Sequence, residues 1–345
     1  MRAVVFDNWR TTPHLADLDR PEPGFGEVLL KVAGAGACHS DVALYREFTP
    51  ESPGALPPPF VLGHESSGWI EALGPGVAGF DIGEAHLVYG PLGCRRCRRC
   101  ASGQVNYCED PGPAAAIGLG RNGGMAEHVA VPAQNLVPLG ELDPVDAAPL
   151  SDAGLTPYHA IKAALPHLAG GGRTALVIGL GGLGRSAVQL LTALTGAAVL
   201  ATDLKEAAVR EAEQDGALAV AGGDGQLAAI RELTGGRGVD AVFDCVGTSA
   251  TMRLAQSSVA QGGRVTVVGI GGGAVEWSMF GMPFESLLTA TYWGSLAELH
   301  EVVDLYRAGQ IRPHVERFAV DEALEAYRRL ERGELSGRAV VVPHA

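Results

Sequence analysis

Two groups of residues in this chain have the side-chain types and the spacing of metal ligands. In the first, Cys94-x2-Cys97-x2-Cys100-x7-Cys108 places four thiols within fifteen residues. Zinc binds four thiolates tetrahedrally, and such short spacings allow a single loop to wrap around the ion. A site with four cysteine ligands has no open coordination position, so we expect a structural zinc here.

The same loop is rich in arginine, which bears on the alternatives to a structural zinc. The cations, which lower the pKa of nearby thiols, are Arg95, Arg96, Arg98 and Arg99. A zinc ribbon could contact nucleic acid through them, but the net charge of −13 argues against an anionic partner. Disulfides and a redox role are disfavoured, because all four thiols fit one metal and the first residues show no secretory signal. We therefore expect zinc-bound thiolates in a cytoplasmic protein.

The second group is spread along the chain and offers three kinds of ligand. Cys38 opens the tetrapeptide CHSD, His64 and Glu65 are adjacent, and Asp152 lies near a change in composition. Each residue alone has an ordinary explanation, as a small buried hydrophobe, a core histidine or a helix cap. Together they supply a thiolate, an imidazole and one or two carboxylates, which are the ligand types of a catalytic zinc that keeps one position for substrate.

A third pattern, G-x-G-x-x-G, is typical of a loop that binds a dinucleotide. It consists of Gly179, Leu180, Gly181, Gly182, Leu183 and Gly184. In such a loop Gly179 permits the tight turn, Gly181 lets a pyrophosphate approach the backbone, and Gly184 packs helix against strand. The helix that follows offers free N–H groups and a positive dipole end to the phosphates.

Asp203 lies 19 residues after Gly184, where a carboxylate can accept both ribose hydroxyls of NAD. The 2′-phosphate of NADP would bring a second negative charge to this place, so we expect NAD. Lys205 is the nearby cation that could weaken the preference. The alternatives are a loop without a ligand in a chain of 48 glycines, and an Asp203 that only caps the helix starting near Lys205.

The elements that must position these residues follow two patterns. Up to about residue 150, short apolar runs such as 28–32 alternate with Pro/Gly turns, which indicates a β-rich region. From 174 to about 269, strands and helices alternate, which predicts a parallel sheet with helices on both faces. We expect strands at 175–178, 198–201, 239–244 and 264–269 and a helix at 186–194. After 293, helices at 297–307 and 321–331 and a strand at 338–342 should return to the first domain.

Length and composition limit the number of domains and the kinds of partner that this chain can have. A length of 345 residues suggests about two domains, and 47% hydrophobic with 19% charged residues permits a large core. The acidic balance opposes a nucleic-acid or anionic-membrane surface. No apolar run approaches the length of a membrane span, so we expect no membrane partner.

Taken together, these motifs resemble the zinc-dependent medium-chain alcohol dehydrogenases over essentially the whole chain. The matching pieces are CHSD at 38–41, GHE at 63–65, the cysteine loop, Asp152, the glycine loop and Asp203. Pro157-Tyr158-His159-Ala160 and Tyr292-Trp293-Gly294 resemble the bacterial secondary-alcohol branch. The resemblance implies an α/β protein in which a GroES-like catalytic domain (1–153), a Rossmann domain (154–294) and a returning segment (295–345) follow one another.

The resemblance also implies roles at the catalytic zinc. Cys38, His64 and Asp152 would hold the ion, with Glu65 behind them or as an alternating ligand. Ser40 would take the first step of the proton relay. Many relatives carry a relay histidine where this chain has Ala43. The onward path is therefore left open among His39, a ribose hydroxyl and water.

Further roles concern the cofactor and the substrate. The resemblance places His39 and Arg338 at the pyrophosphate, Thr156 at the nicotinamide, and Gly269, Ile270 and Trp293 on the carboxamide side, with Val246 also in the cofactor site. The candidate substrate cleft is apolar and consists of Ala43, Phe48, Leu119, Ile270, Phe280 and Trp293. Ordinary core packing is the alternative for each of them, and for Phe280 a subunit contact is an equal alternative.

The activity implied is hydride transfer between NAD(H) and a secondary or primary alcohol, in a homodimer or homotetramer with two zinc ions per chain. The edge of the Rossmann sheet around 275–293 is the expected subunit contact. A polyol or amino-alcohol dehydrogenase is the alternative within the superfamily. A non-catalytic binding protein on the same fold is disfavoured because neither a zinc ligand nor Gly181 is lost, and a zinc-free quinone reductase because both ligand sets are present.

Overall fold

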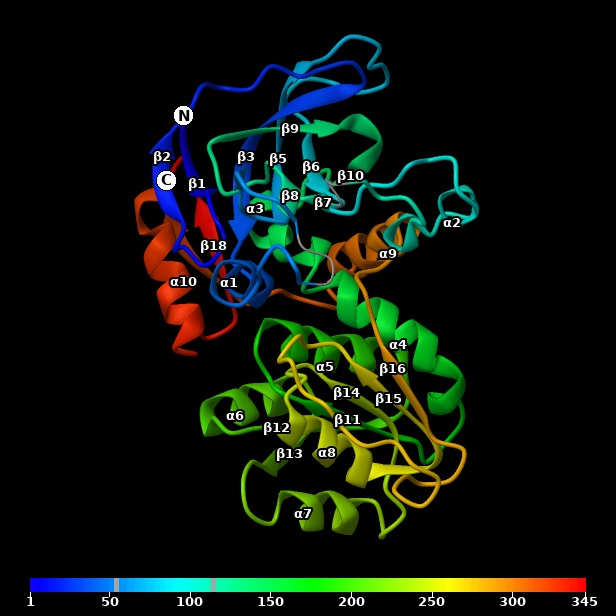
Figure 1. Ribbon diagram of the computed structural model, residues 1–345. Coiled ribbons are helices and arrows are strands. Elements are labelled where there is room, and N and C mark those ends of the chain that lie inside the picture. The colour runs from blue at the N-terminus through cyan, green and yellow to red at the C-terminus, as the bar shows by residue number, and fades with distance from the viewer. Residues whose placement is uncertain (53–55, 113–115) are drawn as a thin grey trace. The chain divides into compact units, whose positions relative to one another are not determined.

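The computed structural model describes residues 1–52, 56–112 and 116–345. The chain forms two compact units (Figure 1). The first unit comprises Met1–Leu155, Gly294–Arg307 and Pro313–Ala345, and the second comprises Thr156–Trp293 and Ala308–Arg312. The chain therefore leaves the first unit, builds the second, and returns.

The first unit is built on mainly antiparallel sheets, in which β17 and β18 form a parallel pair. A three-stranded sheet has the order β2-β1-β4, and a larger one has the order β10-β6-β5-β3-β18-β17, with β9 also paired to β3. These strands are β1 (Arg2–Phe6), β2 (His14–Asp17), β3 (Glu27–Gly36), β4 (Phe60–Val61), β5 (Glu65–Leu73), β6 (Ala85–Val88), β9 (His128–Pro132), β10 (Leu136–Pro138), β17 (Val315–Ala319) and β18 (Arg338–Val342). The short strands β7 (Ala116–Ile117) and β8 (Gly120–Arg121) pair with each other.

The first unit also contains helices and 3-10 turns. They are α1 (His39–Arg46), α2 (Arg98–Ala101), α3 (Pro144–Ala147), α9 (Leu296–Arg307) and α10 (Ala323–Glu331), with 3-10 turns η1 (Val105–Tyr107), η2 (Ala133–Asn135), η3 (Ala148–Ser151) and η4 (Val320–Glu322). The C-terminal strand β18 pairs antiparallel with β3, with Val340 opposite Gly36. Tyr327 of α10 and Val341 of β18 belong to the same buried apolar core as Leu30 of β3. The end of the chain thus pairs and packs with strands from near its beginning.

The second unit is a parallel sheet in the order β13-β12-β11-β14-β15-β16. Its strands are β11 (Thr174–Ile178), β12 (Ala198–Asp203), β13 (Leu218–Ala221), β14 (Val239–Asp244), β15 (Val259–Val267) and β16 (Leu287–Ala290). In chain order this is 3-2-1-4-5-6, the order of dinucleotide-binding sheets. The helices are α4 (Leu155–Leu168), α5 (Gly182–Leu194), α6 (Glu206–Gln214), α7 (Gln226–Leu233) and α8 (Ser249–Ser258), with α5 and α6 on one face and α7 and α8 on the other (Figure 1).

Element types match the sequence-based expectations, and some boundaries differ. The strand at 239–244 and the C-terminal strand at 338–342 are confirmed to the residue. The helix expected from 186 begins four residues earlier at Gly182, because the glycine loop itself forms the first helical turn. Glycine has a low helix propensity, so an apolar pattern does not reveal a helix that starts on it. The strand expected at 264–269 runs from Val259 to Val267.

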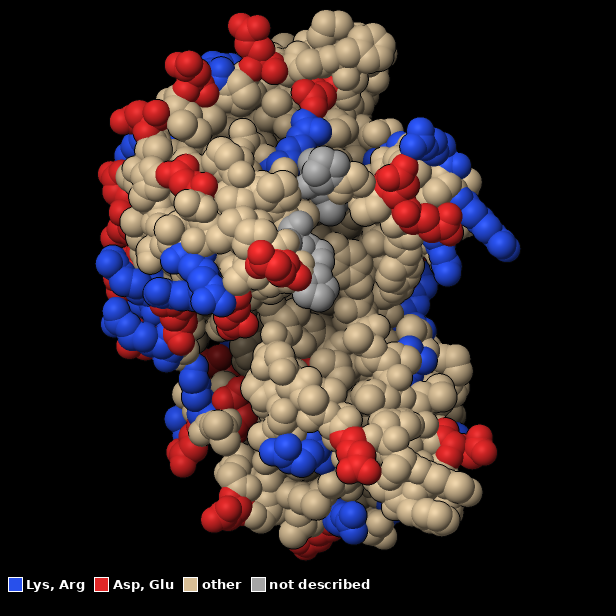
Figure 2. All heavy atoms as spheres, viewed as in Figure 1, with Lys and Arg blue, Asp and Glu red and all other residues tan. Residues whose placement is uncertain are grey.

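Acidic and basic side chains both lie on the face of the molecule in view. Figure 2 shows acidic and basic side chains of the described residues interspersed over this face. Within the described parts of the chain, no helix combines the length and apolar character that crossing a bilayer requires.

Candidate functional site

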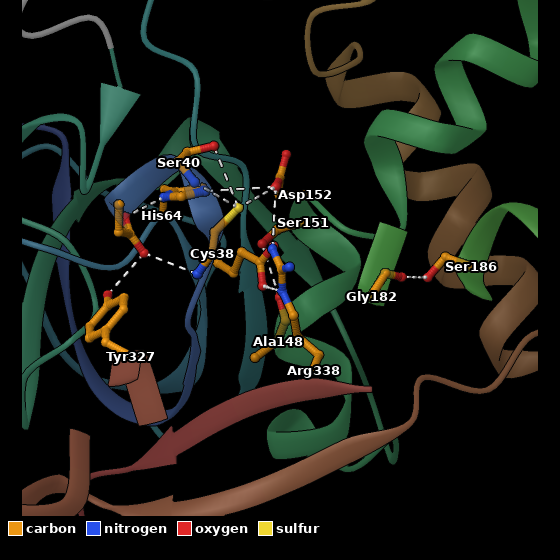
Figure 3. A network of polar contacts seen from close by, with 12 residues as sticks. Cys38, Ser40, His64, Ala148, Ser151, Asp152, Gly182, Ser186, Tyr327 and Arg338 are labelled. Atoms are coloured by element: carbon orange, nitrogen blue, oxygen red, sulfur yellow. Dashed lines mark hydrogen bonds and ion pairs between the residues drawn. The ribbon is translucent and has the colours of Figure 1, made fainter. Parts of the chain in front are cut away.

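The scattered ligand set comes together in the first unit. Cys38, His64, Glu65 and Asp152 offer ligand atoms that all lie within 4.8 Å of one another. The Cys38 Sγ and the His64 Nε2 each lie 3.7 Å from the same oxygen, Oδ2 of Asp152. Figure 3 shows the three side chains pointing toward one another. The sequence separates Cys38 from Asp152 by 114 residues, so the fold alone makes this cluster.

Each ligand sits where an element begins or ends. Cys38 is the N-cap of α1 and its sulfur accepts the N–H of Ser40 at 3.5 Å. His64 directly precedes β5, Glu65 is the first residue of β5, and Asp152 follows the turn η3. These positions bring ligands from separate segments of the chain to one point.

The residues of the cluster have the chemistry of a zinc site. Cys38, His64 and Glu65 are almost fully buried, and the side chain of Asp152 is 14% exposed. Thiolate, imidazole and carboxylate are all zinc ligands, and burial of several such groups together is costly without a cation. The set is therefore suited to zinc, with the partly exposed Asp152 on the open side.

Glu65 is held by an arginine from the C-terminal strand. Arg338 on β18 is 5% exposed, and its Nε donates to Glu65 Oε2 at 2.8 Å while its Nη2 donates to Glu65 Oε1. The same Nη2 lies 3.7 Å from Asp152 Oδ2. Burial raises the pKa of Glu65, and the guanidinium opposes that rise. Gly36 lies opposite Glu65 in the β3–β5 pair, and a Cβ there would overlap the carboxylate.

Arg338 thus has carboxylates as its partners within the first unit. Its expected place at the cofactor pyrophosphate remains a prediction, as does that of His39, which is exposed at the first turn of α1. Ser40 Oγ lies 3.5 Å from Cys38 Sγ, which puts the first expected relay group beside a metal ligand.

Asp41 lies behind the site, and the sequence analysis assigned it no role. It is fully buried, and its Oδ1 lies 3.0 Å from His64 Nδ1. An ionised carboxylate only accepts hydrogen bonds, so the imidazole proton resides on Nδ1 and leaves the Nε2 lone pair for the metal. The sequence signal that could have identified Asp41 was its position in the CHSD motif, three residues after the cysteine ligand. In the structure its Oδ2 accepts the Cys38 N–H at 3.2 Å.

The four-cysteine loop also closes as expected. The sulfurs of Cys94, Cys97, Cys100 and Cys108 lie within 4.8 Å of one another. Backbone amides donate to them: the Cys97 N–H to Cys94 Sγ at 3.3 Å, the Cys100 N–H to Cys97 Sγ at 3.4 Å, and the Cys94 N–H to Cys108 Sγ at 3.3 Å. The amide of Cys100, followed by that of Glu109, lowers the pKa of Cys97 to about 6. Four thiolates in this geometry fit a structural zinc.

The arginines of this loop also bind groups other than the thiols. Arg95 donates to Asn135 at 2.8 Å, Arg96 to Asp110 at 2.7 Å, and Arg99 to Gln104 at 2.7 Å. Backbone N–H groups are the main cause of the lowered pKa values of Cys94 and Cys97, whereas burial raises the pKa of Cys100.

In the second unit the glycine loop has the form expected of a phosphate cradle. Gly179 has φ of +84°, and a Cβ there would overlap the Val246 side chain. A Cβ on Gly184 would overlap the Gly179 carbonyl, so helix α5 packs directly against the turn. Gly181 is the N-cap of α5, and a Cβ there would meet nothing within 4 Å. The open side of Gly181 and the helix N-terminus are suited to a pyrophosphate.

Asp203 ends β12 and joins this loop to the next helix. Its Oδ2 accepts the Leu180 N–H at 2.7 Å and its Oδ1 accepts the Lys205 N–H at 2.9 Å. The second bond supports the capping alternative, since Lys205 is the N-cap of α6. The first bond ties the carboxylate to the glycine loop. Each oxygen keeps a further lone pair, so the partly exposed carboxylate can also accept ribose hydroxyls.

Comparisons with known proteins agree with this geometry. Residues 24–141 match the family model of the alcohol dehydrogenase GroES-like domain, and residues 182–308 match that of the zinc-binding dehydrogenases. An NAD-dependent alcohol dehydrogenase of Sulfolobus acidocaldarius is 32% identical over 99% of both chains. The chain belongs to the zinc-dependent medium-chain alcohol dehydrogenases.

Two further relatives bear on this alcohol dehydrogenase fold. The crystal structure of an alcohol dehydrogenase from Aeropyrum pernix superposes with a TM-score of 0.92 at 33% identity, covering 99% of this chain and 100% of that one. A D-arabinose 1-dehydrogenase (NADP+) of Saccharolobus solfataricus is 32% identical, over 99% of this chain and 97% of its own. The family therefore includes relatives with different substrates and cofactors.

The candidate substrate residues of this dehydrogenase fall into both units. In the first, Ala43 is buried, and Phe48 and Leu119 pack partly buried against the core. In the second, Trp293 is buried with φ of +53°, Ile270 is 53% exposed and Phe280 is 87% exposed. Their part in a substrate cleft stays a prediction.

Of the remaining cofactor candidates, Thr156 is buried, and Gly269 packs so closely on the Val246 backbone that a Cβ would overlap it.

Proposed function

We propose that this chain oxidises a secondary or primary alcohol to the ketone or aldehyde, reversibly, with NAD as the hydride acceptor. The observation that carries the proposal is the convergence of Cys38, His64 and Asp152 on one point. That ligand set belongs to a catalytic zinc rather than a structural one, because it has three protein ligands of mixed type beside a partly exposed side.

The residues around this point have defined tasks. Cys38, His64 and Asp152 would hold the zinc, which when bound supplies a Lewis acid for the substrate oxygen. The Asp41 carboxylate fixes the ring of His64. The hydroxyl of Ser40 would accept the proton of the substrate O–H while passing its own proton onward. NAD, when bound, would supply the hydride acceptor for the carbon that bears this oxygen. Beyond Ser40 the proton path is open among His39, a ribose hydroxyl and water, since Ala43 carries no relay group.

The rival is a dehydrogenase of sugars, polyols or amino alcohols, and the D-arabinose relative gives it weight. Such substrates need several polar partners in the cleft, whereas the candidates Ala43, Phe48 and Leu119 of the first unit are apolar. We therefore favour substrates with an apolar chain. A comparison of kcat/KM for 2-octanol, sorbitol and D-arabinose separates the two. A clear preference for 2-octanol is expected, and a preference for either polyhydroxy substrate would contradict the proposal.

The second unit supports assembly of the enzyme as a homodimer or a larger homo-oligomer. Strand β16 is the edge of its sheet, and an edge strand presents unpaired backbone groups. Large apolar side chains that lie near it are at least 42% exposed, and they are Trp277, Met279, Phe280, Phe284, Leu287 and Tyr292. Exposed apolar clusters of this kind mark interaction sites, and a second copy of the same edge provides a symmetric partner.

We place the enzyme in the cytoplasm. Four of its cysteines are arranged as the ligands of one zinc, and a reducing compartment keeps such thiols free to bind metal.

A further inference from the structure

A tyrosine from the C-terminal helix reaches the rear of the metal cluster. Tyr327 on α10 is 3% exposed, and its hydroxyl donates to Asp41 Oδ2 at 2.9 Å. The other oxygen of Asp41 lies 3.0 Å from Nδ1 of His64. Figure 3 shows the Tyr327 hydroxyl directed toward the group of residues that contains His64 and Cys38. A hydroxyl that is 286 residues from Asp41 in the chain is therefore one carboxylate away from a metal ligand.

Asp41 depends on this hydroxyl because it is a fully buried carboxylate. Its three donors are the Cys38 N–H, the His64 imidazole and the Tyr327 hydroxyl, which come from three separate parts of the chain. A buried carboxylate with too few donors pays a large desolvation cost and relaxes toward other partners. Burial, and then the charge of Asp41, raise the pKa of Tyr327 above its ordinary value, so its hydroxyl stays a donor.

We infer that Tyr327 is a positioning residue for the catalytic zinc: through Asp41 it fixes the orientation of the His64 ring. The inference rests on the catalytic zinc assigned under the proposed function. Groups that orient a metal-binding histidine typically contribute 10- to 100-fold to metal affinity or activity. Because the Tyr327 hydroxyl acts at one remove from that histidine, we expect the lower end, about tenfold.

The chain supplies a matched control at the same helix contact. Tyr45 of α1 packs edge-on against Tyr327, with ring centroids 6.2 Å apart and an interplanar angle of 87°. Its hydroxyl donates to Glu331 at 2.8 Å, and Glu331 also pairs with Arg46. Tyr45→Phe therefore removes a tyrosine hydroxyl from the same α1–α10 contact without touching Asp41.

The experiment compares the wild type, Tyr327→Phe and Tyr45→Phe as zinc-loaded enzymes. Competition with a colorimetric chelator gives the zinc dissociation constant of the catalytic site, and the four-cysteine site serves as an internal reference. We expect binding at the catalytic site to weaken by about tenfold in Tyr327→Phe only. Cobalt substituted at that site should also show altered visible absorption bands in Tyr327→Phe and unaltered bands in Tyr45→Phe.

A double-mutant cycle with Asp41→Asn covers the case in which Tyr327→Phe disturbs folding generally. If the hydroxyl acts through Asp41, its removal has little further effect on zinc affinity once Asp41 is an amide. Additive effects of the two substitutions on zinc affinity would overturn the inference. If the wild type binds two zinc ions and Tyr327→Phe changes neither the zinc affinity nor the cobalt bands, the inference is also overturned. A wild type with a single zinc per chain would instead overturn the catalytic-zinc assignment, and the inference with it.

Discussion

Glu65 on β5 and Arg338 on β18 form a buried pair with two hydrogen bonds, one of them 2.8 Å long, and both side chains are at most 6% exposed. The pair links the strand that follows the ligand His64 to the last strand of the chain. The same Arg338 Nη2 lies 3.7 Å from Asp152 Oδ2, so the guanidinium contacts both carboxylates of the cluster.

Removing one partner of this pair should destabilise the first unit. Arg338→Met leaves Glu65 as a buried charge without its cation, which typically costs about 3–5 kcal/mol. Glu65→Gln together with Arg338→Met should recover part of that loss, because the unpaired charge is then absent. Denaturant unfolding measures the free energy of unfolding of the single and the double variant. A loss below about 1 kcal/mol for the single variant would show that the pair carries little of the fold's stability.

The choice of NAD over NADP should depend on Asp203. Repulsion between its carboxylate and a 2′-phosphate at about 4 Å is worth roughly 1 kcal/mol in water and about 4 at an effective dielectric near 20. The ratio of kcat/KM for NAD over NADP is therefore expected between about tenfold and several hundredfold. In Asp203→Ser the ratio should collapse. Equal use of both cofactors by the wild type would contradict the assignment.

The hydrogen bonds from Leu180 and Lys205 give Asp203 a second, structural task. Asp203→Asn is the matched control for it, since the amide oxygen can still accept one of these bonds while the charge is lost. This variant should lose cofactor discrimination with a smaller loss of stability than Asp203→Ser.

Acid stability of the second unit should depend on Asp240. Its carboxylate in β14 is buried, which alone would raise its pKa, but hydrogen bonds from Arg237, Thr174 and Arg173 together hold that pKa below its ordinary value. A folded-state pKa below the unfolded one stabilises the fold at pH values above the unfolded pKa of about 3.9. The stabilisation is lost as the pH falls through the folded value.

We therefore expect Asp240→Asn to be less stable than the wild type at neutral pH, with the difference shrinking below about pH 4. Unfolding measured across that pH range checks this. Asp224→Asn, at an exposed position of the same unit, is the control and should show no such trend. A difference that stays constant with pH would contradict the assignment of the stabilisation to the ionised carboxylate.

The oligomeric state should respond to a charge on the exposed edge. Phe280 is 87% exposed in the second unit and precedes the edge strand β16 in the sequence, and Phe280→Glu would place a charge in the proposed contact. Light scattering at micromolar concentration should show at least a dimer for the wild type and a shift toward monomer for the variant. Phe25→Glu, at an exposed position of the first unit, should leave the mass unchanged. A monomeric wild type would contradict the proposal.

The sequence was informative where chemistry is local. The cysteine loop and the glycine loop were predictable because each is a continuous stretch whose spacing alone defines the geometry. The ligands Cys38, His64 and Asp152 were harder, since each has an ordinary explanation by itself, and only their combined ligand chemistry and the family resemblance grouped them. The structure now brings their ligand atoms together.

Other features had no sequence signal. Tyr327 contacts Asp41 only because β18 and α10 return to the first unit, and no periodicity or motif predicts that contact. Helix α5 begins inside the glycine motif, where propensity favours a turn, because the helix N-terminus is positioned by packing of Gly184 on Gly179. The partners of the arginines in the cysteine loop likewise depend on where the loop folds back. One example is the hydrogen bond from Arg95 to Asn135.

Zinc-dependent formation of NADH from a secondary alcohol is the most direct measure of the proposed activity. The wild type should contain two zinc ions per chain and reduce NAD with 2-octanol, lose this activity on removal of the catalytic zinc, and regain it on re-addition. Asp152→Ala should be inactive while its circular dichroism stays native, whereas Cys97→Ser should lower the melting temperature, because a structural zinc contributes folding free energy. NADH formation that persists in Asp152→Ala or in zinc-stripped enzyme would contradict a catalytic zinc at Cys38, His64 and Asp152.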